Sequence, residues 1–431
     1  MEPVTLTVAA TAAIIGGVSA FAFRAKRRWH GLLRQLARER SWHFVAGGVF
    51  RVAKVVGREE ARTLTVTTTS DGNTLYTRID VEGPFDGVEL VRGEGISSRV
   101  KKVFSGPDVS VGIPDFDAAI ELRGDPRAVL ARLDGEGRER VSHLVKDSNW
   151  SLIEGKMSVT RSGYIKTFPE LDELTRRLSA VAACLDAQVS DDDMRLGESV
   201  ATGPTAANRL ACFLHLQDPT RRMAAAESLL ADAAPLNRLE AGIALARPRV
   251  IGEALGYALP VEARMRGLEA LFDLAPAAAR ESLRAFLGEH AAGLAEGLQL
   301  AATWTASGVR VMSPEEMLSF AENTDLETAQ ALVAWAVTVG VEAEPVLLRL
   351  LAHLDDGVAT IAAKALGSVA TLTAVHPLMT RSEGVLRASA LKSAAKAAIA
   401  AIQARHSGAE AGGLTVADAL DTGGLGLVDG D

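Results

Sequence analysis

The sequence predicts a multidomain chain of the α+β plus all-α class, with an N-terminal transmembrane helix, an antiparallel-sheet domain, a C-terminal α-solenoid of helix pairs and a disordered tail. Three patterns predict it: an uncharged run over 4–23, two-residue alternation within 44–165, and Ala- and Leu-rich helical spacing over 205–405. A length of 431 residues also exceeds the roughly 250 to 300 residues that one core accommodates.

Composition excludes several classes of protein. Apolar residues form 48% and charged residues 23% of the chain, which is typical of folded domains. The net charge of -8 disfavours nucleic acid as a partner. The two cysteines, Cys184 and Cys212, are too few for a disulfide framework or a four-thiolate zinc site.

The first segment has the length of a membrane span. Val4 to Phe23 contains no charge, and about 20 apolar residues cross a bilayer core. The cations that follow it predict a single-pass protein of the inner (cytoplasmic) membrane, with the N-terminus outside and the bulk of the chain in the cytoplasm. A cleaved signal peptide ending near Val18-Ser19-Ala20 and a buried soluble helix are the alternatives. Small residues around Gly16-Gly17 allow close helix pairing, so a homo-oligomer stays open.

Residues 24–43 are predicted to form a basic amphipathic helix. Its apolar stripe consists of Trp29, Leu32, Leu33 and Leu36 at helical spacing. One interpretation places the helix along the inner leaflet, with anionic lipid headgroups as partners. The other makes it a core-facing helix with a solvated basic flank. The residues assigned to membrane anchoring are Arg24, Lys26, Arg27, Arg28 and Trp29.

Residues 44–165 are predicted to form the α+β domain. Strands are expected at 62–66 and 74–81 around a Ser70-Asp71-Gly72-Asn73 turn. Further strands are expected at 88–91, 109–113 and 118–122, two helices at 125–133 and 138–146, and a hairpin at 150–154 and 156–160.

Asp115 and Asp117 flank Phe116 at what the alternation makes a strand end. Two carboxylates on one side could hold a divalent cation, but no further ligand lies within local reach. We therefore favour a solvated turn with Phe116 in the core. Together with the helix after Asp125 and the Trp150–Thr160 hairpin, this stretch resembles a domain of uncharacterised bacterial membrane-anchored proteins.

An amphipathic helix over 166–193 and a linker over 194–204 are expected next. Leu171, Leu174, Leu178, Val181 and Leu185 form a short heptad seam in that helix. Gly, Ser, Thr and Pro concentrate between Gly197 and Thr205, which favours a linker.

Residues 205–405 read as a series of helices separated by Gly, Pro and Asp. The pattern is clearest after Asp355-Asp356-Gly357, where a helix ends in Ala365-Leu366-Gly367 and a final helix runs over 386–405. This order of residues resembles HEAT-type helical repeats. The resemblance implies a curved stack of helix pairs whose usual role is to bind other proteins.

Residues 406–431 are predicted to be a disordered acidic tail without Lys or Arg. A Gly-Gly-Leu motif at residue 412 recurs at residue 423. Alternating apolar residues in both copies could add a strand to a partner's sheet, and an inert solubilising tail is the alternative. The candidate partner-binding residues are Leu414, Val416, Leu425 and Leu427.

No catalytic, cofactor-binding or metal-ligating motif stands out. The histidines are scattered, and the signatures of zinc hydrolases, nucleotide-binding loops and serine hydrolases are missing from the sequence. No catalytic residue, cofactor, metal or nucleic acid is therefore assigned. The expected function is a membrane-anchored cytoplasmic scaffold or adaptor for protein partners. The alternative is an enzyme whose site lies in the α+β domain, with the array as a regulatory arm.

Overall fold

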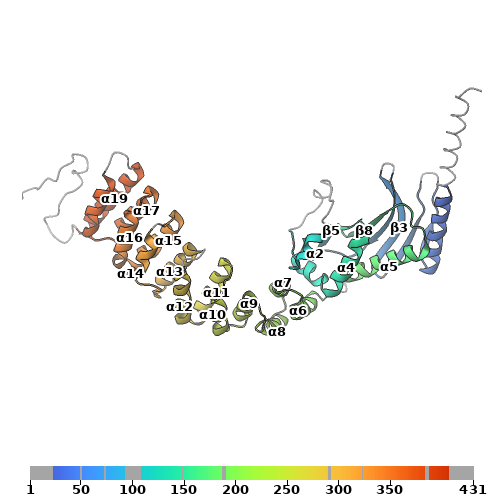
Figure 1. Ribbon diagram of the computed structural model, residues 1–431, viewed down its shortest axis with the longest axis horizontal. Helices are drawn as coiled ribbons and strands as arrows, with labels where there is room; N and C mark the ends of the chain where they lie inside the picture. Colours follow the sequence, from blue (N-terminus) through green and yellow to red (C-terminus); the bar gives the residue numbers. More distant parts are fainter. Residues whose placement is uncertain are drawn as a thin grey trace, which may run out of the picture. The chain divides into compact units, whose positions relative to one another are not determined.

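The chain divides into two compact units, residues 1–237 and 238–431, which are described separately (Figure 1). The structure is a computed structural model. It describes residues 23–48, 51–71, 74–92, 108–147, 149–186, 191–289, 293–322, 324–383 and 388–406. An antiparallel sheet with helices forms most of the first unit, and helices make up the described part of the second, as the sequence predicts.

The first unit begins with a helix over residues 23–39 whose apolar stripe faces the core. Trp29 is only 2% exposed, and Leu33 and Leu36 are fully buried. The Arg40 guanidinium, just beyond the helix, donates two hydrogen bonds of 3.1 and 2.8 Å to the Asp172 carboxylate on helix α5 (Phe168–Leu185). The core-facing interpretation of this segment is therefore confirmed.

The described helices do not agree with the predicted membrane topology. Across the residues that the structure describes, no helix combines the length and apolar character needed to cross a bilayer. The predicted transmembrane helix in the fold class, and the single-pass location in the inner membrane, are accordingly wrong. Residues 4–22 of the predicted span lie outside the described residues, and the helix described over residues 23–39 is amphipathic and basic.

An eight-stranded antiparallel sheet forms the centre of the first unit within the described residues. Its spatial order is β1-β2-β3-β4-β8-β7-β5-β6. The strands, in chain order, are β1 (His43–Val45), β2 (Lys54–Glu59), β3 (Arg62–Asp71), β4 (Thr74–Glu82), β5 (Val88–Arg92), β6 (Ile120–Gly124), β7 (Asn149–Ile153) and β8 (Lys156–Ser162). The predicted strands at 62–66, 74–81 and 88–91 and the predicted hairpin at 150–160 are confirmed.

The two faces of the sheet differ because side chains alternate along each strand. Leu64 opposite Val81 and Val66 opposite Ile79 are fully buried on one face. Helix α5 packs against strand β4 and helix α4 (Gly135–Asp147) against β7 (Figure 1). On the other face, the Asp80 carboxylate accepts a hydrogen bond of 2.7 Å from the Ser158 hydroxyl and lies 3.2 Å from Lys156 Nζ.

The strand expected at 109–113 is a loop in the structure. Only Asp108 forms an isolated bridge, with Arg123. The cause is Asp117, whose carboxylate accepts hydrogen bonds from the backbone N–H groups of Val111, Gly112 and Ile113. Those N–H groups therefore turn toward a side chain and are lost to strand pairing.

Pro114 then starts a short helix, α2 (Pro114–Ala119), ahead of β6. Asp115 and Asp117 consequently lie on a helix and not at a strand end. Phe116 is buried, as the favoured interpretation requires. Helix α3 (Pro126–Arg132) follows, and the Asp125 side chain accepts a hydrogen bond from the Arg127 N–H as its N-cap.

The linker expected at 194–204 is mostly a helix, α6 (Asp192–Thr202). The Asp191 side chain caps it by accepting from the Met194 N–H at 3.0 Å. Leu196, Ser199 and Val200 are buried at helical spacing, and this packing outweighs the Gly and Ser punctuation of the sequence. Helices α7 (Ala206–Leu214) and α8 (Pro219–Leu229) follow in the same unit.

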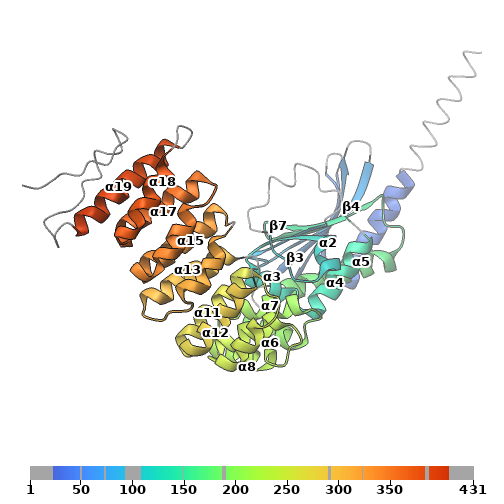
Figure 2. The same ribbon diagram turned by 60° about the vertical axis from the view of Figure 1, so that its left-hand side comes forward.

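The second unit consists of helices that pack in two rows (Figure 2). Helices α13, α15, α17 and α19 lie side by side in one row, and α12, α14, α16 and α18 form the other. The described helices after α9 (Pro235–Ala244) are α10 (Pro248–Leu255), α11 (Val261–Leu274), α12 (Pro276–Gly288), α13 (Leu294–Ala306), α14 (Pro314–Met317), α15 (Leu326–Val339), α16 (Glu344–Leu351), α17 (Asp356–Val369), α18 (Val375–Ser382) and α19 (Ser389–His406).

Two consecutive segments of this unit repeat the same structure. Helices α15 and α17 start at residues 326 and 356, which are 30 residues apart, and each follows an Asp N-cap. The short 3-10 helices η3 (Val341–Ala343) and η4 (Leu372–Ala374) come next, 31 residues apart. Helices α16 and α18 start at residues 344 and 375, again 31 residues apart.

A buried carboxylate links the two segments. Glu344, at the start of α16, accepts hydrogen bonds from the Thr371 N–H at 3.0 Å and from the Thr373 hydroxyl at 2.5 Å. The N-terminus of η4 is thereby fixed to the preceding helix pair. Such nearest-neighbour contacts are how stacked helix pairs stabilise one another.

Candidate functional site

A hollow of about 750 Å³ opens beside the N-terminal turns of the helix over 23–39. We call it the basic hollow. Residues of that helix form one side, and residues 162–166, which connect β8 to α5, form the other. The lining residues are Arg24, Ala25, Arg27, Arg28, Trp29, Ser162, Gly163, Tyr164, Ile165 and Lys166.

Backbone pairing fixes the 162–166 side of the hollow. Gly163 donates its N–H to the Leu75 carbonyl at 2.7 Å, and its own carbonyl accepts from the Thr77 N–H at 3.0 Å. Gly163 adopts a φ of 76°, a backbone conformation in which glycine is favoured. The chain therefore leaves strand β8 at this point, and Ile165 turns into the core.

The floor of the hollow is aromatic. The Trp29 and Tyr164 ring centroids are 5.8 Å apart, with planes tilted by 36°. Trp29 Nε1 is buried and has no hydrogen-bond partner among the described residues. Burial raises the pKa of Tyr164, so its hydroxyl is protonated at neutral pH.

The rim of the hollow is positively charged. Arg24, Arg27, Arg28 and Lys166 line it, and none of its described lining residues is acidic. The pKa of His30 on the same helix is lowered, first by burial and then by the charges of Lys26 and Arg34. Only the smaller part of this shift, from Lys26 and Arg34, reflects the positive charge along the helix, because neighbouring cations disfavour a further positive charge.

The structure brings together four of the five residues assigned to membrane anchoring. Arg24, Arg27, Arg28 and Trp29 share the basic hollow, whereas Lys26 is exposed outside its lining. Trp29 is a core residue here and not a headgroup contact. Tyr164 and Lys166, which lie far along the chain, were not predicted from the sequence. The tail residues Leu414, Val416, Leu425 and Leu427 lie outside the described residues.

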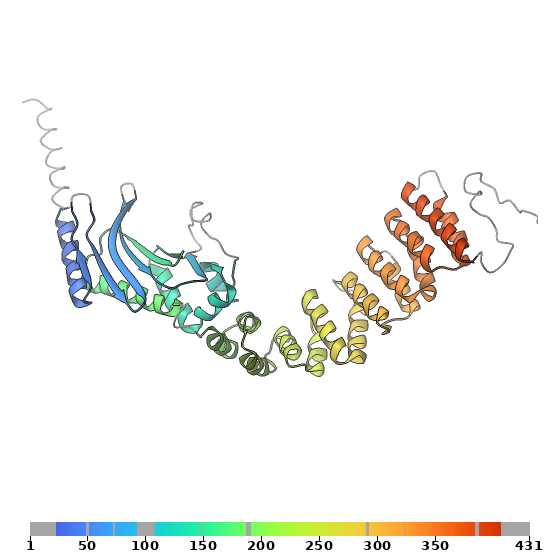
Figure 3. The ribbon, with the colours of Figure 1, turned by 180° about the vertical axis from the view of Figure 1, so that it is seen from behind.

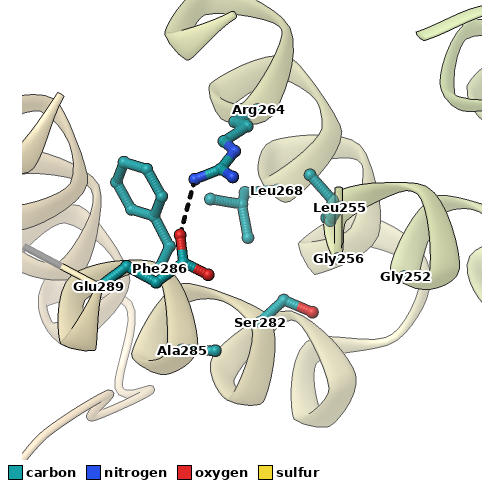
Figure 4. A pocket seen from close by; sticks show the side chains of 9 residues that line it. All are labelled: Gly252, Leu255, Gly256, Arg264, Leu268, Ser282, Ala285, Phe286 and Glu289. Atoms are coloured by element: carbon teal, nitrogen blue, oxygen red, sulfur yellow. Dashed lines mark hydrogen bonds and ion pairs between the residues drawn. The ribbon is translucent and has the colours of Figure 1, made fainter. Parts of the chain in front are cut away.

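A second, smaller cavity of about 110 Å³ lies between helices α10, α11 and α12 (Figure 4). The Arg264 guanidinium donates to Glu289 at 3.1 Å and to the Tyr257 carbonyl at 3.0 Å, and it lies 5.3 Å from the centroid of the Phe286 ring. The space is large enough for several water molecules.

The described part of the chain offers little to conventional active-site chemistry. No group of three or more His, Cys, Asp or Glu side chains within it is placed to hold a metal ion. Burial raises the pKa of Cys212 to about 11 and also raises that of Cys184, so neither thiol is ionised at neutral pH. The Asp117 carboxylate is engaged by the loop before α2.

The outer face of the α12–α18 row carries paired charges. Arg284 of α12 forms an ion pair with Glu316 of α14. Arg349 of α16 pairs with Glu322 at 2.6 Å. The first pair joins two successive helices, the second joins α16 to the residue after the 3-10 helix η2 (Leu318–Ala321), and each neutralises one positive and one negative side chain.

The exposed residues of helices α15, α17 and α19 are chiefly small or uncharged, and we call the surface that they form the small-residue face. Exposed Lys364 and Lys396 add the charge in its middle. The other exposed residues that define it are Gln330, Ala334, Val337 and Thr338 on α15, Ser368 on α17, and Ala397, Ala400 and Ala401 on α19.

Apolar side chains flank this face at one edge. Val341 and Leu372 are the first residues of η3 and η4, so they occupy equivalent positions in the repeated segments. They are 51% and 55% exposed. The repeat therefore places one exposed apolar side chain beside the C-terminal end of α15 and another beside that of α17.

Comparisons with known proteins give no relative. The chain matches no protein-family model, no curated protein and no solved structure.

Proposed function

We propose that this protein is a scaffold that recruits a protein partner through its helical array, whose helix pairs are similar to HEAT repeats. The observation that carries the proposal is the equivalent exposure of Val341 and Leu372 at one edge of the small-residue face. Stacked helix pairs commonly present extended binding surfaces of this kind.

The difference between the exposed residues of the two rows supports the small-residue face as the binding surface. Small side chains let another chain approach closely, and exposed apolar residues at regular intervals supply the contact area that is removed from water. On the opposite face, Arg284 pairs with Glu316 and Arg349 pairs with Glu322. A partner that docked there would have to break those pairs or bury them.

The test compares acidic substitutions at the two surfaces of the full-length chain. Val341→Asp combined with Leu372→Asp places charge on the proposed edge. Thr380→Asp on α18 is the matched control, because Thr380 is exposed on the other row. Each variant is used as bait in the source cells, with recovered proteins quantified by mass spectrometry and binding then measured with the purified partner.

We expect the double variant to weaken binding of a specific partner by about tenfold or more, since burying an unpaired carboxylate costs at least about 1.4 kcal/mol. Thr380→Asp should leave binding unchanged. Equal recovery of every partner with all three proteins would contradict the proposal, provided that thermal melting shows each variant to be folded.

A further inference from the structure

We infer that the basic hollow binds a small organic anion, one whose phosphate, carboxylate or sulfonate group is attached to an aromatic or apolar body. This site lies in the first unit and is independent of the partner-binding surface proposed above. It combines a cationic rim with an aromatic floor in a single space of about 750 Å³.

The rim supplies the charge recognition. Arg24, Arg27 and Arg28 come from one helix, and Lys166 comes from a segment far along the sequence. The fold thus brings cations from two segments to one space, and no acidic side chain is among the described residues that line it. Guanidinium groups bind phosphate and carboxylate groups through two parallel hydrogen bonds, which favours an anion over a neutral ligand.

The floor explains why the anion should carry an apolar body. Trp29, Tyr164 and Ile165 line the same space as the cations. Trp29 is 2% exposed, and its indole N–H has no acceptor among the described residues. Trp150 and Trp335 also have unpartnered indole N–H groups, but neither lines this hollow. A ligand oxygen above the floor could accept this bond, and buried donors normally have such a partner.

The helix itself provides a control for charge alone. Lys26 lies between the lining residues Ala25 and Arg27 but is exposed and outside the hollow. A surface that attracts anions only through its net charge would respond equally to the loss of any of these cations. A built site would respond only to those that line it.

The experiment is isothermal titration of the full-length chain with three probes at constant ionic strength. 1-Naphthyl phosphate carries both the charge and the apolar body, inorganic phosphate carries only the charge, and 1-naphthol carries only the body. The variants are Arg27→Gln and Lys166→Gln, with Lys26→Gln as the matched control.

We expect 1-naphthyl phosphate to bind more tightly than either of the other probes. Arg27→Gln and Lys166→Gln should each raise its Kd by about tenfold, which is typical of losing one charge-assisted contact, while Lys26→Gln leaves it within about twofold. The inference is overturned if 1-naphthyl phosphate does not bind, if phosphate alone binds as well, or if Lys26→Gln weakens binding as much as the lining variants do. Unchanged thermal melting of the variants confirms that any loss is local.

Discussion

Arg209 and Asp232 join helix α7 to the loop after helix α8 through a two-point ion pair, with Nε–Oδ2 and Nη2–Oδ1 distances of 2.7 and 3.0 Å. The Asp232 carboxylate also accepts a hydrogen bond from the Asn237 side chain at 2.9 Å and from the Ala234 N–H. Its side chain is only 3% exposed. These bonds favour the charged form of the carboxyl group and, led by that from Arg209, lower the pKa of Asp232 to about 2.

This pKa predicts a loss of stability in acid. A carboxyl group whose folded-state pKa lies below its unfolded value of about 3.8 stabilises the fold above that value and loses the contribution as the pH falls toward 2. We expect Asp232→Asn to lower the free energy of unfolding of the first unit by about 1 to 2 kcal/mol at pH 7, with the difference from the unsubstituted chain shrinking between pH 4 and pH 2.

Urea denaturation at several pH values, read by hydrogen exchange over α7 to α8, measures this effect. Glu253→Gln is the control, because Glu253 pairs with Arg249 on a strongly exposed helix surface. It should change stability by less than about 0.5 kcal/mol. A pH-independent effect of Asp232→Asn would show that the ion pair is not its cause.

Trp29 provides a test of the core-facing helix. Because the side chain is buried against Tyr164, Trp29→Ala should destabilise the first unit by about 3 to 5 kcal/mol, the usual range for removing a buried Trp or Phe. Phe23→Ala on the same helix should cost less than about 0.5 kcal/mol, since Phe23 is 66% exposed. Equal, small effects of the two substitutions in chemical denaturation would place Trp29 on the surface and remove the floor of the basic hollow.

Residue patterns within a short stretch of sequence were enough to predict some of the strands and helices. Strands β3 and β4 follow from strict alternation around Ser70-Asp71, and helix α17 follows from Asp355 with apolar residues at helical spacing. Helix α6 could not be predicted this way. Its Gly197, Ser199 and Thr202 are typical of a linker, and only burial against the rest of the first unit outweighs them.

The residues of the basic hollow could likewise be predicted only in part from local sequence patterns. The cations after residue 23 and Trp29 were recognised as functional candidates, but the apolar stripe alone does not distinguish a membrane surface from a protein core. Tyr164 and Lys166 reach the hollow because Gly163 pairs with Leu75 and Thr77 on β4. That pairing joins residues far apart in the sequence, so no local motif around residue 164 predicts it.

Asp115 and Asp117 are expected to differ in their contribution to stability. Asp117 accepts bonds from three backbone N–H groups and from the Ser110 hydroxyl at 2.7 Å. Asp117→Ala leaves those donors without their acceptor and should destabilise the first unit by about 2 to 3 kcal/mol. Asp115→Ala, at an exposed position on α2, should change it by less than about 0.5 kcal/mol. Thermal and urea unfolding of the two variants measure the difference, and the reverse order would refute this role for Asp117.

Two glycines in the second unit should respond in opposite directions to the same change. A Cβ added at Gly297 on α13 would lie 2.7 Å from the Phe286 ring, so Gly297→Ala must displace that ring and should cost about 1 to 3 kcal/mol. A Cβ at Gly252 on α10 would meet no atom within 4 Å. Gly252→Ala should therefore stabilise the unit by about 0.5 to 1 kcal/mol through its better helix propensity.

Equilibrium unfolding of both variants, with hydrogen exchange over α10 to α13, measures the sign directly. Because Arg264 lies over the Phe286 ring, we expect Gly297→Ala also to speed amide exchange around the Arg264 to Glu289 contact. Stabilisation by both substitutions would mean that α12 and α13 pack with room to spare. The close helix contacts that give the array its rigid repeated surface would then have to lie elsewhere, such as at Gly367, where a Cβ would meet Ala398 of α19 at 3.0 Å.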